Sequence, residues 1–258
     1  MGVLTLLTDF GDRDAYVGVM KGVILGIAPQ TTIVDLTHGI PPQNVAVGRF
    51  QLQTAYSYFP PGTVHVAIVD PGVGSARRPI ALATESAWFV GPDNGLLTGI
   101  QDPIQMAVHL DRPQYWRTAQ PSTTFHGRDI FASVAAYLCA GVAITALGRA
   151  IDPQTLIHLT LPLNDSADGQ SMTGCIQSID HFGNLISNLK FENTQVHAGE
   201  IQLHNVRLPL QSTYADATIG NLVAIVGSHG FIEIAVNCGN AQQQLGCQIG
   251  DRITLYLS

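Results

Sequence analysis

The sequence has few charged side chains, and most of those are acidic. Of its 258 residues, 12 are Lys or Arg and 19 are Asp or Glu, which gives a formal net charge of -7 at pH 7. Nucleic acids and anionic membranes are recognised through clustered basic side chains, so we expect neither as a partner. Charged residues make up 12% of the chain and hydrophobic residues 46%. This composition is typical of a compact globular protein, and the low charge also favours an oligomer that buries part of its surface.

Three further features are missing. No uninterrupted apolar run reaches the roughly 18 residues of a membrane-spanning helix, and residues 1–9 lack a basic region, so we expect no signal peptide. The chain has four cysteines, Cys139, Cys175, Cys238 and Cys247. They show no CxxC spacing, which favours reduced thiols in the cytoplasm. The nine histidines include no HExxH motif and no cluster with ligand spacing, so we predict no metal.

Up to about residue 163, short β-branched runs alternate with helical patterns. Strands are predicted at Val3–Leu7, Thr32–Leu36, Val64–Val69 and Ala87–Val90. Helices are predicted at Tyr16–Gly26, Ala46–Tyr58 and Ile130–Ala140, with the Ala-rich Gly141–Ala150 continuing the last one or following it closely. This rhythm is typical of βαβ units and predicts an α/β domain with a mainly parallel sheet.

Polar and turn-forming residues at Leu161–Gln170 break this pattern. We therefore predict an N-terminal domain at 1–163, a linker at 164–170 and a C-terminal domain at 171–258. Strands of the second domain are predicted at Met172–Ile179, Leu185–Leu189, Glu200–Leu208, Leu222–Val226, Phe231–Val236 and Arg252–Leu257. Their close spacing is typical of a small antiparallel β-barrel or sandwich.

Residues 69–78 (VDPGVGSARR) carry the strongest local indication of a site. The run before them is β-branched and apolar, as in a buried parallel strand, so Asp70 falls at a carboxyl strand end, where open α/β sheets bind ligands. Gly72 and Gly74 would let backbone approach a ligand, and Arg77 follows shortly. The alternative is a turn capped by Asp70 and followed by two solvated arginines.

The loop after the first predicted strand, residues 8–16 (TDFGDRDAY), places Asp9 at another strand end. A carboxylate there is suited to accept both hydroxyls of a ribose, and Asp12 or Asp14 could cap the following helix. The alternative is that all three aspartates cap or solvate the turn. Neither GxGxxG nor GxxxxGK[ST] occurs here, so a dinucleotide or P-loop phosphate site is not supported.

A third loop, residues 123–131 (TTFHGRDIF), places His126 next to Gly127. Imidazole titrates near neutrality and glycine permits close approach, so His126 is a candidate general base or polariser. The alternative is a hydrogen-bonded loop histidine, with Arg128 and Asp129 simply pairing or capping.

A fourth segment, residues 179–188 (IDHFGNLISN), arranges Asp180 and Asn184 around a turn. A carboxylate and an amide so placed can hold an ammonium group or an adenine edge. The alternative is a hairpin in which Gly183 and Asn184 serve the turn geometry.

Six blocks, in order along the chain, carry a family resemblance. They are residues 8–11 (TDFG) with 16–22 (YVGVMKG), 35–38 (DLTH), 70–74 (DPGVG), 91–95 (GPDNG), 125–129 (FHGRD), and Asp180 with 182–184 (FGN). Together they resemble the family of S-adenosyl-L-methionine (SAM) hydroxide adenosyltransferases, the adenosine-forming SAM hydrolases related to fluorinating and chlorinating enzymes. The resemblance covers essentially the whole chain.

This resemblance implies an N-terminal α/β domain joined to a C-terminal β-barrel. It implies a homotrimer whose small-molecule substrate lies between the N-terminal domain of one subunit and the C-terminal domain of its neighbour, with no cofactor and no metal. The family's Asp-Arg-His triad falls on Asp70, Arg77 and His126.

The resemblance also implies the substrate-binding residues. Asp9 would hold the ribose hydroxyls, Asp180 the methionine ammonium group and Asn184 the adenine. Four more residues would lie near the ligand: Phe59, Tyr214, Ser228 and Asn237. Two positions depart from relatives: Ser133 replaces a proline that many carry, and His229 stands where a halogenating relative has arginine.

The implied reaction is attack of water or hydroxide on the ribose C5′, which expels methionine and leaves adenosine. The sulfonium is already a strong electrophile, whereas water, with a pKa of about 15.7, needs activation. Arg77 would stabilise hydroxide, His126 would act as a base and Asp70 would orient them. Two alternatives stay open: a halide-dependent adenosyltransferase, against which the complete triad argues, and a non-catalytic SAM or adenosine sensor, for which the triad would be superfluous.

Overall fold

The structure is a computed structural model that describes residues 2–166, 169–191 and 199–257. The chain forms two compact units, one from Met1 to Leu159 and one from Thr160 to Ser258. Each unit has its own sheet and its own hydrophobic core.

A seven-stranded sheet forms the centre of the first unit. Four strands pair in parallel, namely β2 (Thr32–Thr37), β1 (Val3–Thr8), β3 (Thr63–Ile68) and β5 (Ala87–Pro92). Antiparallel pairing adds β4 (Pro79–Ala83), β6 (Met106–His109) and β7 (Arg149–Ile151), in the order β2-β1-β3-β5-β4-β6-β7. Every residue of β3 is buried, because a central parallel strand is covered on both faces.

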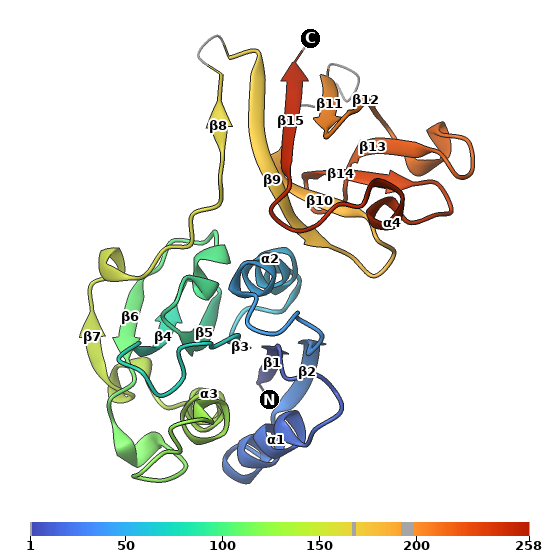
Figure 1. Ribbon diagram of the computed structural model, residues 1–258. Helices are drawn as coiled ribbons and strands as arrows, with labels where there is room; N and C mark the ends of the chain where they lie inside the picture. The colour runs from blue at the N-terminus through green and yellow to red at the C-terminus, as the bar shows by residue number, and fades with distance from the viewer. Residues whose placement is uncertain (1, 167–168, 192–198, 258) are drawn as a thin grey trace. The chain divides into compact units, whose positions relative to one another are not determined.

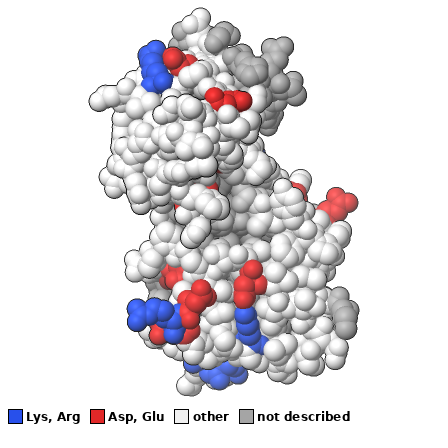
Figure 2. Space-filling view, turned by 90° about the vertical axis from the view of Figure 1, so that its right-hand side faces the viewer, with Lys and Arg blue, Asp and Glu red and all other residues white. Residues whose placement is uncertain are grey.

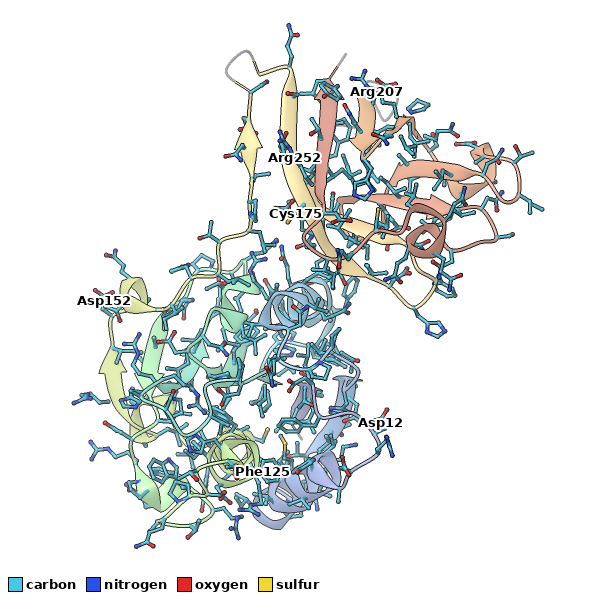
Figure 3. The ribbon with its side chains drawn as sticks, in the orientation of Figure 1. Asp12, Phe125, Asp152, Cys175, Arg207 and Arg252 are labelled. Carbon is cyan, nitrogen blue, oxygen red and sulfur yellow. The ribbon has the colours of Figure 1, made fainter. Side chains whose placement is uncertain are left out.

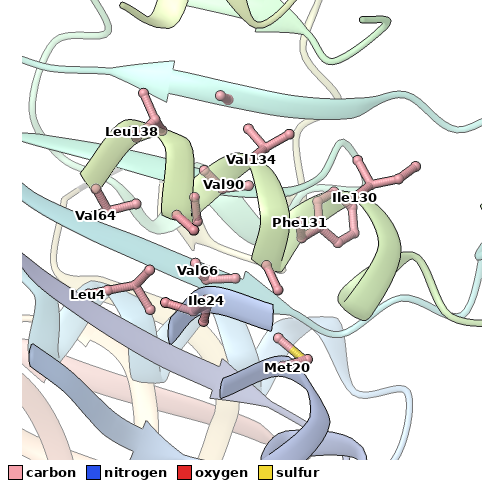
Figure 4. Packing of buried hydrophobic residues seen from close by; sticks show 14 of the residues in the cluster. Leu4, Met20, Ile24, Val64, Val66, Val90, Ile130, Phe131, Val134 and Leu138 are labelled. Carbon is pink, nitrogen blue, oxygen red and sulfur yellow. The ribbon is translucent and has the colours of Figure 1, made fainter. Parts of the chain in front are cut away.

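Helices cover both faces of this sheet. Helices α1 (Tyr16–Ile27) and α3 (Ala132–Cys139) pack together on one face, and α2 (Val45–Ala55) lies on the other (Figure 1). Short helical turns occur at Tyr56–Tyr58, Leu96–Gly99, Pro113–Tyr115, Ile144–Ala146 and Pro153–Thr155, and a π-helical turn, η4 (Gly127–Phe131), leads into α3. The core between sheet and helices includes Leu4, Met20, Ile24, Val64, Val66, Val134 and Leu138 (Figure 4).

The sequence predicted the α/β class and the main elements of this unit, which are confirmed, but one segment was wrong. Residues Gly141–Ala150, expected to be helical, form a 3-10 turn and the start of β7. Helix α3 ends because its C-cap, Ala140, is followed by Gly141 at φ +90°, a left-handed conformation that terminates helices. Strands β4 and β6 were not predicted.

The second unit is a closed β-barrel. Its strands are β8 (Asn164–Asp165), β9 (Ser171–Ile179), β10 (Leu185–Lys190), β11 (Gly199–Leu203), β12 (Val206–Gln211), β13 (Leu222–Val226), β14 (Phe231–Val236) and β15 (Arg252–Leu257). They pair in the order β10-β14-β13-β12-β11-β15-β9-β8, and β10 also pairs with β9, which closes a ring of seven strands. The barrel interior includes Leu185, Leu189, Ile201, Leu203, Ile232, Ile234 and Leu255.

The predicted barrel is confirmed, with two differences. The pairing of β12 with β13 is parallel, so the barrel is mixed rather than purely antiparallel. Residues Glu200–Leu208, predicted as one strand, form the end of β11 and the start of β12, joined by a two-residue turn at His204 and Asn205. That turn was missed because His-Asn lacks the glycine that marks most tight hairpins.

Two surface features complete the description. Among the described residues, the helices are all too short or too polar to form a membrane-spanning segment. Charged side chains are sparse on the face shown in Figure 2, as the composition leads one to expect.

Candidate active site

Two candidate carboxylates lie at the same edge of the first unit's sheet. Asp9 follows β1, and Asp70 comes two residues after β3. The two strands run parallel with Thr8 opposite Ile68, so their carboxyl ends meet. This is the edge at which open α/β sheets bind ligands.

Arg77 links Asp70 to His126. Its Nε donates to both carboxylate oxygens of Asp70, at 2.9 and 3.0 Å, and its Nη2 contacts Asp70 Oδ2 and lies 2.8 Å from His126 Nδ1. The side chains of Asp70 and Arg77 are only 6% and 7% exposed. The guanidinium also lies over the Phe131 ring, 5.2 Å from its centre. Asp70 and Arg77 are seven residues apart in the sequence and His126 follows Arg77 by 49, and the three side chains form one largely buried network.

This network defines the tautomer of His126. A guanidinium has only donors, so Nδ1 of His126 must accept from Arg77, and a neutral imidazole then carries its proton on Nε2. Burial, followed by the nearby positive charge of Arg77, lowers the pKa of His126 below 6.5. At neutral pH the ring is therefore uncharged and offers an Nε2–H donor.

One donor of Arg77 is left over. Its Nη1 is buried and meets no acceptor among the residues that the structure describes. An unsatisfied buried donor costs about 1–3 kcal/mol, and groups of this kind often mark functional sites.

Arg78, by contrast, is a structural residue. Its Nε donates to the buried carboxylate of Asp93 at 2.8 Å, and its Nη2 donates to the Thr155 carbonyl at 2.6 Å. The alternative of two solvated arginines after the Asp70 turn is therefore wrong for both.

A cavity of about 150 Å³ opens beside the triad. It is lined by Phe10, Tyr16, Ile68, Asp70, Val73, Thr124, Phe125, His126 and Gly127. The rings of Phe10, Tyr16 and Phe125 contact one another with centres 5.1–5.8 Å apart, and Figure 3 shows Phe125 close to the helices of this unit. The cavity thus combines an aromatic wall with the carboxylate and imidazole of the triad.

Glycine lets the triad loops come together. Gly74 has φ +76°, and a Cβ on it would lie 2.3 Å from the Thr123 carbonyl oxygen. The sequence suggested that Gly74 admits a ligand, but its bare backbone instead admits the loop that carries His126.

Asp129 anchors that loop. It accepts hydrogen bonds from Arg117 Nε at 2.5 Å, Arg128 Nε at 2.7 Å and the Ser122 amide at 2.8 Å. Burial alone would raise the pKa of Asp129, but these donors outweigh it and hold the pKa far below its ordinary value. The expected pairing of Arg128 with Asp129 is confirmed.

Ser133, which stands where many relatives carry a proline, donates to the Tyr115 carbonyl at 2.8 Å.

Asp9, at the same edge of the sheet as Asp70, is half-buried. Its Oδ2 accepts from the Gln43 amide at 2.8 Å. Asp12 and Asp14 are exposed, as Figure 3 shows for Asp12. Neither caps helix α1, whose N-cap is Ala15 with no side-chain hydrogen bond.

Phe59 lies elsewhere in the first unit. It precedes β3 and so lies at the amino end of the strand, opposite to Asp70. Its ring packs edge-on against the buried His65, with centres 5.7 Å apart. The structure therefore does not bring Phe59 to the triad.

Most candidate residues of the second unit share one open pocket of about 370 Å³. It is lined by Phe182, Asn184, Tyr214, Val236, Asn237, Cys238 and Gly239. Asp180 supports it, because its Oδ2 accepts from Asn184 Nδ2 at 2.9 Å and its Oδ1 from the Asn184 amide at 2.8 Å. Ser228 is exposed in the turn after β13 and does not line the pocket.

Glu233, a buried carboxylate that supports this pocket, was not predicted from the sequence. Tyr214 donates to its Oε1 at 2.6 Å, and His229 Nε2 lies 3.3 Å from its Oε2. Burial and then the Glu233 carboxylate raise the pKa of Tyr214. A single acidic residue inside the apolar run of β14 was the available signal.

Comparison with known proteins gives consistent results for both units. A family model described as the SAM hydroxide adenosyltransferase N-terminal domain matches residues 4–148, and the corresponding C-terminal domain model matches residues 174–254. An (R)-S-adenosyl-L-methionine hydrolase from Salinispora tropica is 40% identical over 97% of this chain and 96% of its own length. A fluorinase from Actinoplanes sp. is 28% identical over 98% of this chain and 97% of its own length.

The fold has a solved counterpart. The crystal structure of an uncharacterized conserved protein from Thermotoga maritima matches with a TM-score of 0.90 and 32% identity, covering 98% of this chain and 99% of that one.

Proposed function

Because this chain belongs to the SAM hydroxide adenosyltransferase family, we propose that it hydrolyses S-adenosyl-L-methionine to adenosine and L-methionine, using Asp70, Arg77 and His126. Its full-length identity to a named hydrolase is 40%, against 28% to a fluorinase, which favours hydrolysis over halide transfer.

The observation that carries the proposal is the donor set around the triad. Arg77 donates to Asp70 and His126 through Nε and Nη2. Its Nη1 is buried and has no acceptor among the described residues. Together with Nε2–H of His126, this provides donors for an oxygen nucleophile. Donors held in place by a buried network stabilise developing negative charge without having to reorganise.

In the proposed reaction, the oxygen of water or hydroxide forms a bond to C5′ while the C5′–S bond breaks. The bonding electrons return to sulfur, which leaves as the neutral thioether of methionine, and one proton is released overall. Arg77 and His126 hold the oxygen by donation, and Asp70 fixes the plane of Arg77. His126 thus acts as a donor rather than as the base that the sequence suggested, because its Nε2 already carries a proton and its Nδ1 accepts from Arg77.

The substrate is held by Asp9 at the sheet edge and by the candidate residues in and beside the barrel pocket. Asp9 binds the ribose hydroxyls through its second oxygen, and in the barrel Asp180 and Asn184 bind the ammonium group and adenine. Tyr214 and Asn237 complete the barrel pocket. The roles of Phe59 and Ser228 stay predictions, since neither lies with these groups.

We further propose a homotrimer with shared sites, in the cytoplasm. The first unit's cavity of about 150 Å³ is smaller than the about 300–1,000 Å³ of ligand pockets, so the barrel of a neighbouring subunit would complete it. Mixing Arg77→Ala chains with Asn184→Ala chains should restore activity if sites are shared between subunits.

The four cysteines are free thiols, which supports the proposed cytoplasmic location, because that compartment is reducing.

Incubation with SAM followed by chromatography tests the function. The (R) and (S) forms at sulfur are supplied separately, because the Salinispora relative is named for the (R) form, with chelator present and with or without chloride or fluoride. Adenosine and methionine in every salt condition would support the hydrolase. A halogenated nucleoside would move the chain to halide transfer, and bound but intact SAM would identify a sensor.

A further inference from the structure

We propose that His204, Cys247 and Asp251 form a zinc-binding site in the barrel, separate from the hydrolytic triad. They are the one group of three potential metal ligands that the described part of the chain brings together. One ligand atom from each residue can be chosen so that all three lie within 4.8 Å of one another.

The spacing suits a tetrahedral ion. Cys247 Sγ lies 3.6 Å from His204 Nδ1, whereas Asp251 Oδ2 lies 3.2 Å from the other ring nitrogen, Nε2. An imidazole binds an ion through one nitrogen, so for an ion shared by Nδ1 and Cys247 the Asp251 carboxylate must turn from Nε2 toward Nδ1. With Zn–S of about 2.3 Å and Zn–N of about 2.0 Å, adjacent sulfur and nitrogen ligands of tetrahedral zinc are about 3.5 Å apart. The cysteine and histidine therefore already have the separation that zinc requires, the carboxylate is the third ligand, and water would be the fourth.

Two segments converge on this group, the turn between β11 and β12 and the loop between α4 and β15. His204 occupies the tight turn between β11 and β12, and the pairing of Leu203 with Ile253 places that turn beside the start of β15, next to Asp251. Cys247 follows the short helix α4 (Ala241–Leu245) and its left-handed cap Gly246. The His204 side chain is 44% exposed and that of Asp251 21%, so an ion can reach the buried thiol from solvent.

Backbone strain at His204 also indicates function. Its φ is +51°, in the left-handed region that glycine occupies readily. A two-residue hairpin turn takes such a φ, and a non-glycine residue held in this conformation is also found at functional sites. Here the strained residue directs an imidazole toward a thiol and a carboxylate.

The chemistry selects the metal. A thiolate and a carboxylate around a neutral imidazole suit a divalent cation, and sulfur favours zinc over magnesium or calcium. Metal binding deprotonates a coordinating thiol, so each ion bound near neutral pH must displace about one proton.

The site would hold a segment that borders the substrate pocket. Residues 237–239 line that pocket, and the Gln242 amide donates to the Gly183 carbonyl at 2.9 Å, which ties α4 to the Asn184 turn. Cys247 lies at the other end of the same segment. A zinc ion there would anchor it and stabilise the folded barrel, without taking part in the attack on C5′.

Metal titration of the full-length protein tests this proposal. The chain is stripped with chelator, exchanged into buffer with a phosphine reductant, and titrated with Co²⁺ by absorbance and with Zn²⁺ by calorimetry in two buffers of different ionisation enthalpy. We expect one equivalent of Co²⁺ with a thiolate charge-transfer band, tight binding of one Zn²⁺, and release of about one proton per ion. The absence of a thiolate band would overturn the proposal.

Two variants distinguish this site from adventitious binding by surface histidines. Cys247→Ser removes the thiolate, and His204→Gly removes the imidazole while suiting the positive φ, so the fold is kept. Cys247→Ser should lose the thiolate charge-transfer band, and His204→Gly should no longer bind Co²⁺ with a one-equivalent endpoint. Both should lose the zinc-dependent rise in melting temperature. Cys139→Ser, a free thiol in the other unit, should bind like the parent. Binding unchanged by His204→Gly would refute the site.

Discussion

The two units hold their candidate residues by opposite means. In the first, Asp70, Arg77 and His126 form a charged network, largely withdrawn from water, on loops that follow parallel strands. In the barrel, amide side chains and a tyrosine line an open pocket, and the supporting carboxylates of Asp180 and Glu233 are engaged in hydrogen bonds to Asn184 and Tyr214.

The difference indicates a division of work. A buried ion pair contributes little net stability because of its desolvation cost, so the Asp70–Arg77 pair is better explained by chemistry that needs preorganised charge. Neutral donors and acceptors are enough to hold a nucleoside, and in the proposed site the one charged group of the barrel that meets substrate is Asp180, at the ammonium group. Variants of the triad should therefore lower turnover, whereas those of Asp9 and of the barrel pocket should lower affinity.

Loss of Arg77 should have the largest effect. We expect Arg77→Ala to lower kcat by about 100- to 1,000-fold while SAM affinity changes little, because in our proposal Arg77 donates to the nucleophile and not to SAM. Arg77→Lys should also lower kcat, because an ammonium lacks the planar set of donors with which a guanidinium can bind Asp70, His126 and a nucleophile at once. Turnover is measured as methionine release and affinity by calorimetry, with Arg112→Ala, at an exposed arginine, as the control. Equal losses of affinity and turnover would contradict this division.

The first unit should also be the more sensitive to acid. His65 is buried against Thr5 Oγ1, and burial lowers its pKa from 6.5 to about 4. As the pH falls from 6.5 to 4, His65 becomes protonated in the unfolded chain but stays neutral in the folded chain. The free energy of unfolding therefore decreases by up to about 3 kcal/mol.

Urea unfolding followed by tryptophan fluorescence can measure this effect, because Trp88 and Trp116 both lie in the first unit. His65→Gln does not titrate in this range and should show a much flatter dependence between pH 7 and pH 4.5. An unchanged slope in that variant would assign the acid sensitivity to other groups.

Asp9 is the test of binding within the first unit. Asp9→Ala should weaken SAM affinity by about 10- to 100-fold, as expected when charge-assisted hydrogen bonds worth about 1.5–3 kcal/mol are lost. The matched control is Asp12→Ala, in the same loop but exposed. A fall in kcat at unchanged affinity would instead place Asp9 with the triad.

The smallest effect is expected in the barrel. Tyr214→Phe removes a neutral hydroxyl held by Glu233, so KM should rise by about fivefold, the equivalent of about 1 kcal/mol, with kcat nearly constant. Tyr58→Phe, at a highly exposed ring, is the control. A larger effect on kcat than on KM would contradict the proposed division between the units.

Parts of this structure could be predicted from the sequence because they depend on local patterns. The β-branched run before Asp70 predicted a buried strand, and Asp9 and Asp70 were each predicted at a carboxyl strand end; the structure brings these two ends to the same edge of the sheet. The triad could be named only through resemblance, since nothing local in residues 123–131 says which partner His126 will have. Glu233 was overlooked because one acid in an apolar strand also fits an outward-facing position.

By itself, the sequence determined the class of each unit, the carboxyl strand ends that bear Asp9 and Asp70, and the family to which the chain belongs, because periodicity and motif order are properties of the chain. Only the tertiary structure decided that Arg77 bridges Asp70 and His126 while Arg78 ties down a loop, and that His204, Cys247 and Asp251 meet. Several of these contacts join residues more than 40 positions apart, as those of Arg77 with His126 and of His204 with Cys247 do. They depend on strand register and turn geometry that no local window of sequence contains.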